Sequence, residues 1–180
     1  MPSIKKAIRM TRRHFVAAGT MGGAAVAVGC TASNHGSWDF LDDAQSRTLA
    51  AICDQIVPAD DFPSASQAGV VTYIDRQLAR HYRRHRDTYR DGLAQAEEMS
   101  RKRFGREPAA LAAPQQVELA GDLSQQNPEF FNLVRSHTLE GYYGAPRHGG
   151  NRDAVSWRML GVPEPPVCGR AQYGPGKGPA

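Results

Sequence analysis

Apolar residues recur every three or four positions along most of residues 42–162, and this spacing constrains the fold more than any other feature of the chain. Residues spaced in this way form a stripe along one face of an α-helix. No stretch of useful length alternates apolar and polar residues, as a half-buried strand would. We therefore predict an all-α protein, a small irregular bundle of about four to six helices with a long glycine-rich loop near the C-terminus.

Turn formers and capping residues predict where the first helices begin and end. Asp42-Asp43 opens the first helix, and Pro58 stops it. A second helical pattern runs from about Ser66, bends or breaks near residues 83–87, and ends at Gly105. The residues expected to face the core along these patterns are Ala44, Leu49, Ile52, Cys53, Ile56, Val70, Tyr73, Ile74, Leu78, Tyr82, Tyr89, Leu93, Ala96, Met99 and Phe104.

Two prolines predict where the later helices begin. Pro114 suits the first turn of one helix, because an amide hydrogen has no partner within the helix at that position. Asn127-Pro128 has the form of an N-cap followed by the first residue of another helix. The core-facing residues expected in these helices are Val117, Leu119, Ala120, Leu123, Phe131, Val134, Leu139 and Tyr142.

Residues 1–30 have the composition of an export signal. Arg12-Arg13 is followed by Phe15 and by a weakly hydrophobic, uncharged run from Val16 to Gly29 that is too short for a stable membrane span. This arrangement resembles the twin-arginine signal, which implies a protein exported already folded, often because it or a partner travelling with it holds a cofactor. The alternative is a basic amphipathic helix that stays inside the cell.

Two ways of processing this signal remain open, and both place the protein in the periplasm. Ala25-Val26-Ala27 fits the small-x-small site of a leader peptidase, which would cleave after Ala27. Val28-Gly29-Cys30 is similar to a lipobox, in which Cys30 becomes the lipidated first residue, although Ala27 stands where a lipobox prefers leucine. Lipidation of Cys30 would add a membrane anchor.

The positive charge of the chain belongs to this signal. The formal net charge is +4, but residues 1–30 hold five Lys and Arg and no Asp or Glu, so the remaining residues sum to −1. A near-neutral mature chain lacks the basic excess that is typical of a nucleic-acid-binding protein. We therefore expect no nucleic-acid partner.

The cysteines that follow the signal, Cys53 and Cys168, lack the close spacing of a zinc or c-type haem motif. In an oxidising compartment they could pair with each other, or one could bridge to another subunit. Alternatively, Cys53 is a small buried residue of the first helix. The sequence leaves these alternatives open.

Composition divides the mature chain into three parts. Residues 31–37 are predicted to form a polar linker and residues 38–162 a helical domain. Residues 163–180 are rich in proline and glycine and poor in apolar anchors, which predicts an extended tail.

The segment 141–163 differs from the rest of the chain, because a helix runs into a glycine-rich loop that contains the polar trio Asn151-Arg152-Asp153. Asp153 is predicted to N-cap a short helix from Ala154 to Leu160. Gly161 would close this helix, and Pro163 would prevent it from continuing.

This segment resembles the small subunit (subunit 3) family of gluconate 2-dehydrogenase. Residues 56–61 and 69–75 look like two further elements of that family, so the resemblance extends from about Asp42 to Pro163. Val162 departs from the pattern, which usually has an aromatic residue there, and Cys168 has no place in it. The matching positions in the loop segment are Tyr142-Tyr143, Gly144, Pro146, Gly149-Gly150-Asn151, Asp153, Trp157, Gly161 and Pro163.

The resemblance implies an accessory subunit without an active site of its own. Such subunits accompany a large flavoprotein of the glucose–methanol–choline oxidoreductase type, which holds FAD, often with a multihaem cytochrome c that supplies haem c as the electron outlet. The complex oxidises sugars, aldonic acids or glycosides in the periplasm. The large partner typically lacks an export signal, so the small subunit would carry it through the twin-arginine translocase. The alternative is an independent periplasmic enzyme or binding module that shares the fold.

We expect no catalytic, cofactor-binding or metal-binding residue in the chain itself, since no G-x-G-x-x-G follows a strand pattern. His81 and His85 lie among arginines that would repel a metal cation, and they predict a solvated or partner-facing basic patch. The glycine-rich loop could dock a partner, pack against its own domain, or do both. The candidate docking residues are Tyr142, Tyr143, Pro146, His148, Asn151, Arg152, Asp153 and Trp157.

Overall fold

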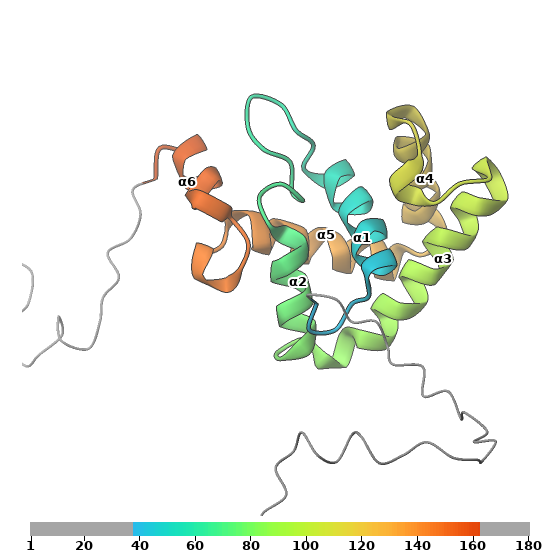
Figure 1. Ribbon diagram of the computed structural model, residues 1–180, viewed down its shortest axis with the longest axis horizontal. Helices are drawn as coiled ribbons and strands as arrows, with labels where there is room; N and C mark the ends of the chain where they lie inside the picture. Colours follow the sequence, from blue (N-terminus) through green and yellow to red (C-terminus); the bar gives the residue numbers. More distant parts are fainter. Residues whose placement is uncertain (1–37, 163–180) are drawn as a thin grey trace, which may run out of the picture. The chain divides into compact units, whose positions relative to one another are not determined.

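The computed structural model describes residues 38–162, which form six α-helices and no strand (Figure 1). The predicted all-α class is therefore confirmed. The expectations for the signal, the linker, the tail, Cys30 and Cys168 concern residues outside this range. None of the helices within residues 38–162 has both the length and the apolar composition needed to cross a membrane.

The helices follow one another with short 3₁₀ turns between several of them. The α-helices are α1 (Asp43–Ile56), α2 (Val70–Ala79), α3 (Arg86–Phe104), α4 (Ala113–Gln126), α5 (Pro128–Tyr143) and α6 (Val155–Met159). The 3₁₀ turns are Arg83–His85, Pro108–Ala110, Pro146–His148 and Arg152–Ala154.

The predicted capping residues define several helix ends. Asp42 and Gln45 form a capping box at α1, in which Asp42 Oδ1 accepts from Gln45 N at 2.8 Å and Gln45 Oε1 accepts from Asp42 N at 3.1 Å. The Asn127 side chain caps α5 by accepting a hydrogen bond of 3.1 Å from Phe130 N. Gly105 ends α3 in the left-handed conformation, with a φ of 69°.

The second helix begins later than the sequence predicted, at Val70 instead of about Ser66. Gly69 has a φ of 83°, which interrupts the helical path just before α2. The break predicted near residues 83–87 is confirmed, because the 3₁₀ turn Arg83–His85 separates α2 from α3.

The predicted apolar stripes are buried or half-buried except at two positions. Ala44 and Val117 are exposed, the latter by 61%. Val117 lies two residues before Leu119, about 200° around α4, so it faces away when Leu119 faces inward. Phe130 was not predicted to be in the core, yet it is fully buried.

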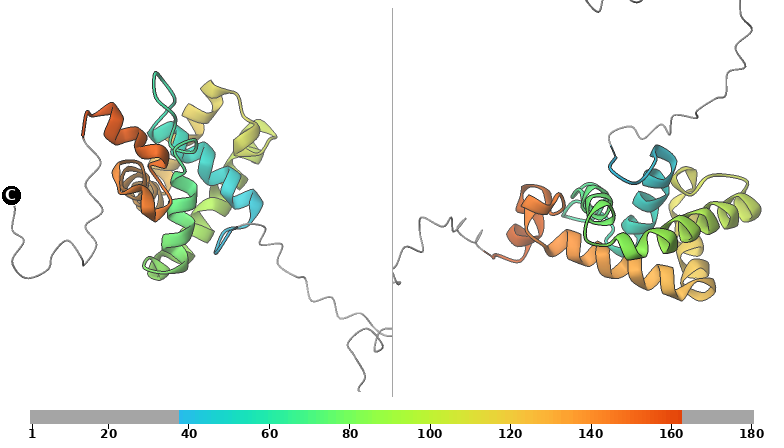
Figure 2. Two further views of the ribbon diagram at one scale, coloured as in Figure 1. Left: turned by 60° about the vertical axis from the view of Figure 1, so that its left-hand side comes forward. Right: turned by 90° about the horizontal axis from the view of Figure 1, so that it is seen from below.

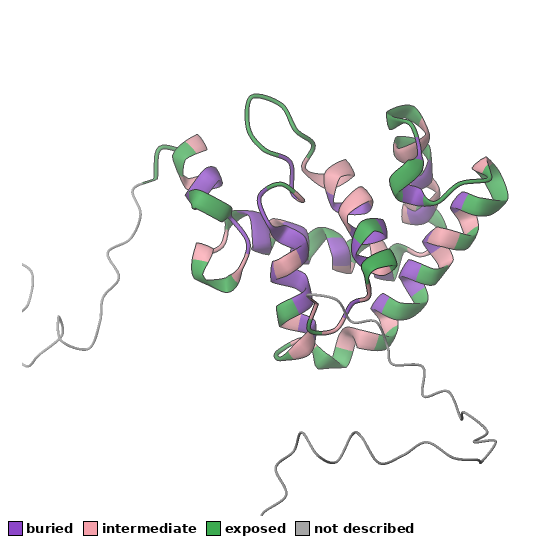
Figure 3. Cartoon of the chain, in the orientation of Figure 1, coloured by how far each residue is buried: buried purple, intermediate pink, exposed green. Residues whose placement is uncertain are grey.

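The core lies where α1, α2, α3 and α5 face one another. Helix α5 packs against each of α1 to α4, and Figure 2 shows it alongside α3. Figure 3 shows buried residues along the inner faces of these helices. Buried core residues include Leu49, Ile52, Cys53, Val70, Ile74, Leu78, Tyr89, Leu93, Phe130, Val134 and Tyr142.

Gly92 allows α3 and α5 to approach closely. The ring of Phe130 lies against the Gly92 backbone, and a Cβ at this position would overlap the ring. The Tyr89 ring meets Phe130 edge to face, with 5.7 Å between the centroids. In contrast, a Cβ added at Gly121 of α4 would meet nothing within 4 Å.

This difference predicts opposite effects for the same substitution. Gly92→Ala should lower the free energy of unfolding by about 1–3 kcal/mol, because the added methyl group overpacks the core. Gly121→Ala should raise it by up to about 1 kcal/mol, because alanine has the higher helix propensity. Urea unfolding measures both values, and equal effects of the two substitutions would contradict this packing.

Candidate functional site

The C-terminal segment, residues 141–162, continues from the end of α5. Tyr142 is buried, and its hydroxyl donates a hydrogen bond of 2.8 Å to the Pro63 carbonyl. The neighbouring Tyr143 is 41% exposed. The two adjacent tyrosines therefore differ in role, since Tyr142 anchors the segment to the domain and Tyr143 lies at the surface.

The side chain of Asn151 holds the loop together from within. It is fully buried, its Nδ2 donates to the Gly144 carbonyl at 2.8 Å, and its Oδ1 accepts from Ser156 N at 2.9 Å. The prediction that Asp153 caps the short helix is wrong. Asp153 is exposed, has a φ of 56°, and makes no capping hydrogen bond, and the helix begins at Val155.

The loop backbone adopts an unusual conformation that neighbouring hydrogen bonds support. Asn151, Asp153 and Ala154 have φ values of 44°, 56° and 53°, in a region that non-glycine residues rarely adopt. Arg152 N donates to the Ala68 carbonyl at 2.9 Å, which ties the loop to the turn before α2. Hydrogen bonds from Arg152 N to the Ala68 carbonyl and from Ser156 N to Asn151 Oδ1 thus hold the strained residues in place.

Glycines permit the close approach of this loop to the helices. A Cβ at Gly150 would overlap the Gly141 carbonyl in α5, and a Cβ at Gly69 would lie 2.8 Å from the Gly149 carbonyl. Within α5, a Cβ at Gly141 would also lie 2.7 Å from the Tyr73 ring. The loop therefore packs directly against the backbones of α2 and α5.

The remaining docking candidates lie at or near the surface. Trp157 is half-buried, and its Nε1 donates to the Tyr143 carbonyl at 2.9 Å. Pro146 is also half-buried, whereas His148 and Arg152 are exposed. Of the eight candidates, Tyr142 and Asn151 are buried and support the segment from within, and the other six are exposed or half-buried.

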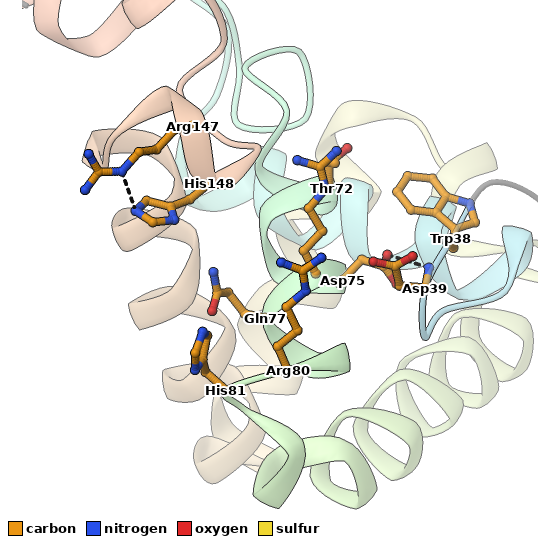
Figure 4. Close-up of a pocket in the computed structure, with 10 residues that line it drawn as sticks. Trp38, Asp39, Thr72, Asp75, Gln77, Arg80, His81, Arg147 and His148 are labelled. Atoms are coloured by element: carbon orange, nitrogen blue, oxygen red, sulfur yellow. Dashed lines mark hydrogen bonds between the residues drawn. The ribbon is translucent and has the colours of Figure 1, made fainter. Parts of the chain in front are cut away.

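A groove of about 520 Å³ lies beside this segment (Figure 4). Figure 4 shows Arg147 and His148 on one wall, Trp38 and Asp39 on the opposite wall, and residues of α2 between them. Five of the lining residues are basic: Arg76, Arg80, His81, Arg147 and His148. We call this feature the basic groove. The complete lining is Trp38, Asp39, Thr72, Asp75, Arg76, Gln77, Arg80, His81, Arg147 and His148.

Asp75 fixes the wall that Trp38 and Asp39 form. It is buried, and its carboxylate accepts hydrogen bonds from the backbone amides of Asp39, Phe40 and Leu41 at 2.8, 2.9 and 2.9 Å. No local pattern predicts this role of Asp75, because its partners lie 34 to 36 positions earlier in the chain.

His81 and His85 do not lie on one helical turn, because α2 ends at Ala79. His81 lines the basic groove, while the ring of His85 meets His137 edge to face at 5.7 Å. Among residues 38–162, no three or more His, Cys, Asp or Glu side chains gather as metal ligands would. His81 and His85 therefore lie in different parts of the domain.

A polar aromatic cluster that sequence analysis missed surrounds His137 on α5. His137 Nδ1 and the Tyr89 hydroxyl are joined by a hydrogen bond of 2.9 Å, and the imidazole stacks on Tyr82 at 4.2 Å. The Tyr82 hydroxyl donates to Glu140 at 2.5 Å. Burial lowers the pKa of His137 from its ordinary 6.5 to about 4, so the ring is neutral at pH 7.

This lowered pKa predicts how acid affects stability. Between about pH 6.5 and pH 4 the unfolded chain binds a proton that the folded His137 does not, so folding stability falls as the pH falls. The loss attributable to His137 should be about 2–3 kcal/mol. His137→Gln should remove this component, because glutamine can accept from Tyr89 but does not titrate.

Denaturant unfolding at several pH values measures this effect. His148→Gln is the matched control, because it removes an exposed histidine and should retain the wild-type dependence. A His137→Gln variant as acid-sensitive as the wild type would show that His137 does not cause the loss.

A known protein family matches nearly the whole of the part of the chain that the structure describes. Residues 43–163 match the model of the family described as Gluconate 2-dehydrogenase subunit 3, which is more than half of the sequence. The chain therefore belongs to that family, and membership implies a place in a multisubunit dehydrogenase complex. No curated protein and no solved structure matched the chain.

Proposed function

We propose that the chain is the non-catalytic small subunit of a periplasmic FAD-dependent dehydrogenase complex that oxidises sugars, aldonates or glycosides. It supports assembly of a large flavoprotein of the glucose–methanol–choline type and its export through the twin-arginine translocase. Where the complex has a third subunit, it is a multihaem cytochrome c in this proposal. The observation that carries it is the family match over residues 43–163, which includes the entire C-terminal segment.

The surface of the C-terminal segment supports a role in partner binding. Tyr143, Leu160 and Val162 are exposed by 41%, 59% and 47%, and the half-buried Trp157 is hydrogen-bonded to the backbone of Tyr143. Exposed aromatic and aliphatic side chains of one segment are typical of interfaces between proteins. Because Asn151 and Tyr142 fix the backbone from within, little conformational entropy is lost when a partner binds.

Two side chains with nucleophilic or acid–base chemistry, Cys53 and His137, are inside the domain and are not presented at its surface. Cys53 is fully buried, and burial raises its pKa to about 12, so it remains a thiol at neutral pH. His137 is buried and neutral. In the proposal, FAD is held by the flavoprotein and haem c by the cytochrome.

The N-terminal residues support the export role. Arg12, Arg13 and Phe15 resemble the twin-arginine motif, whose route carries folded proteins. A flavoprotein loaded with FAD in the cytoplasm is cargo of this kind. Processing after Ala27 gives a soluble periplasmic subunit, and lipidation of Cys30 gives an anchored one.

A signal variant tests the proposal. Arg12→Lys with Arg13→Lys should retain both this chain and the flavoprotein in the cytoplasm, because lysine does not reproduce the planar guanidinium pair. Arg9→Lys keeps the same charge outside the motif and should leave export unchanged. Cell fractionation, with immunodetection of both proteins, measures the outcome.

Two results would contradict the proposal. A flavoprotein that still reaches the periplasm with the double variant is not carried by this chain. A wild-type chain that purifies without any flavoprotein, from cells that express both, is not a subunit of its complex.

A further inference from the structure

The basic groove contains arginines whose charges are not matched by neighbouring carboxylates. None of the ion pairs found within residues 38–162 involves Arg76, Arg80 or Arg147. Other arginines of the domain do have such partners, as when Arg103 on α3 pairs with Glu118 on α4 at 2.6 Å. Arginines elsewhere in residues 38–162, such as Arg83 and Arg84, are also outside these ion pairs, but the groove gathers three such guanidinium groups around one hollow.

The two carboxylates on the groove wall offset the charges of the three arginines only in part. Both oxygens of Asp75 already accept hydrogen bonds from the backbone amides of residues 39–41. This leaves Asp39 as the exposed carboxylate among the ten lining residues, opposite Arg147 and His148. Three arginines and two aspartates give the lining a formal charge of +1, and because the oxygens of Asp75 are occupied by amides, the guanidinium groups favour a ligand that carries carboxylates.

The shape of the groove favours a chain segment over a small ion. Its volume is about 520 Å³, it is open to solvent, and its basic side chains come from α2, from the turn after it and from the turn Pro146–His148. Arg76 lies in the last turn of α2 and Arg80 is its C-cap residue, and both side chains line the groove. Sites spread in this way suit several carboxylates on one polypeptide.

The given residues on either side of the described domain do not supply such a segment. Outside residues 38–162 its sequence contains one acidic residue, Glu164. These flanking residues therefore favour another molecule as the source of a ligand with several carboxylates.

We propose that the basic groove binds an acidic surface segment of a partner protein, through Arg76, Arg80 and Arg147. Under the proposed function, on which this identification rests, the partner is the flavoprotein. The groove adjoins the C-terminal segment, because Arg147 and His148 belong to both. Charge in the groove and aromatic surface in the C-terminal segment then act as two parts of one interface.

The first test uses the purified full chain and a fluorescently labelled hexaglutamate peptide. Arg80→Glu with Arg147→Glu should weaken peptide binding about tenfold or more, because two attractive contacts become repulsive. Arg47→Glu with Arg135→Glu changes exposed arginines on α1 and α5 and alters net charge equally, so it should weaken binding less than about threefold.

The same measurement contains the outcomes that overturn the proposal. Equal weakening by both double variants would mean that only net charge matters. Displacement of the peptide by low millimolar inorganic phosphate would identify a site for small anions. A wild-type dimer that becomes monomeric in the groove variant would identify an interface between two copies of this chain.

The second test identifies the partner by co-purification of the flavoprotein. The groove variant should retain less than about a tenth of the wild-type yield, while the control variant retains most of it. Full retention by the groove variant would overturn the groove as the flavoprotein site and leave the proposed function standing. If the wild type captures no flavoprotein, the proposed function fails, and the peptide experiment still decides whether the groove binds acidic segments.

Thermal unfolding of each variant separates binding from folding. Arg80 and Arg147 are exposed, so the groove variant should melt close to the wild type. Should charge reversal destabilise the domain, Arg80→Gln with Arg147→Gln removes the same cations without adding carboxylates. Wild-type affinity of that milder variant for hexaglutamate would overturn the proposal.

Discussion

The buried amide of Asn151 is the interaction on which the arrangement of the candidate site depends. It donates to the Gly144 carbonyl and accepts from Ser156 N, so it joins the end of α5 to the start of α6 across the loop between them. A side chain that both donates and accepts is required, because each of these backbone groups needs the opposite partner. With the loop closed in this way, Trp157 and His148 are held in defined places at the surface.

Helix α2 is the platform to which the other parts of the site attach. Its Asp75 holds the segment that begins at Trp38, and the turn before it accepts the amide hydrogen of Arg152. Arg76 and Arg80 then face a groove whose opposite walls are both fixed to α2. The packing around α2 thus both brings the basic side chains of the groove together and fixes the C-terminal segment.

Local signals in the sequence predicted the helices well, and long-range contacts explain what they missed. Asp42, Asn127 and Gly105 act on backbone groups a few residues away, so residue type and position were sufficient to predict their capping roles. Residue type also favoured Asp153 as a cap, but the loop's conformation instead depends on Asn151 and on distant backbone contacts. The basic groove joins residues far apart in the sequence, which periodicity cannot reveal.

Under the proposed function, residues 141–162 fold onto α2 and α5 to form the surface that binds the flavoprotein. Asn151→Asp tests it most directly, because the carboxylate cannot donate to the Gly144 carbonyl. The measurement is the yield of co-purified flavoprotein, with amide hydrogen exchange of the variant to locate the opened region. We predict faster exchange in residues 144–162, unchanged protection in α1, α3 and α4, and a yield about tenfold lower. A wild-type yield from a variant whose residues 144–162 exchange freely would contradict the account.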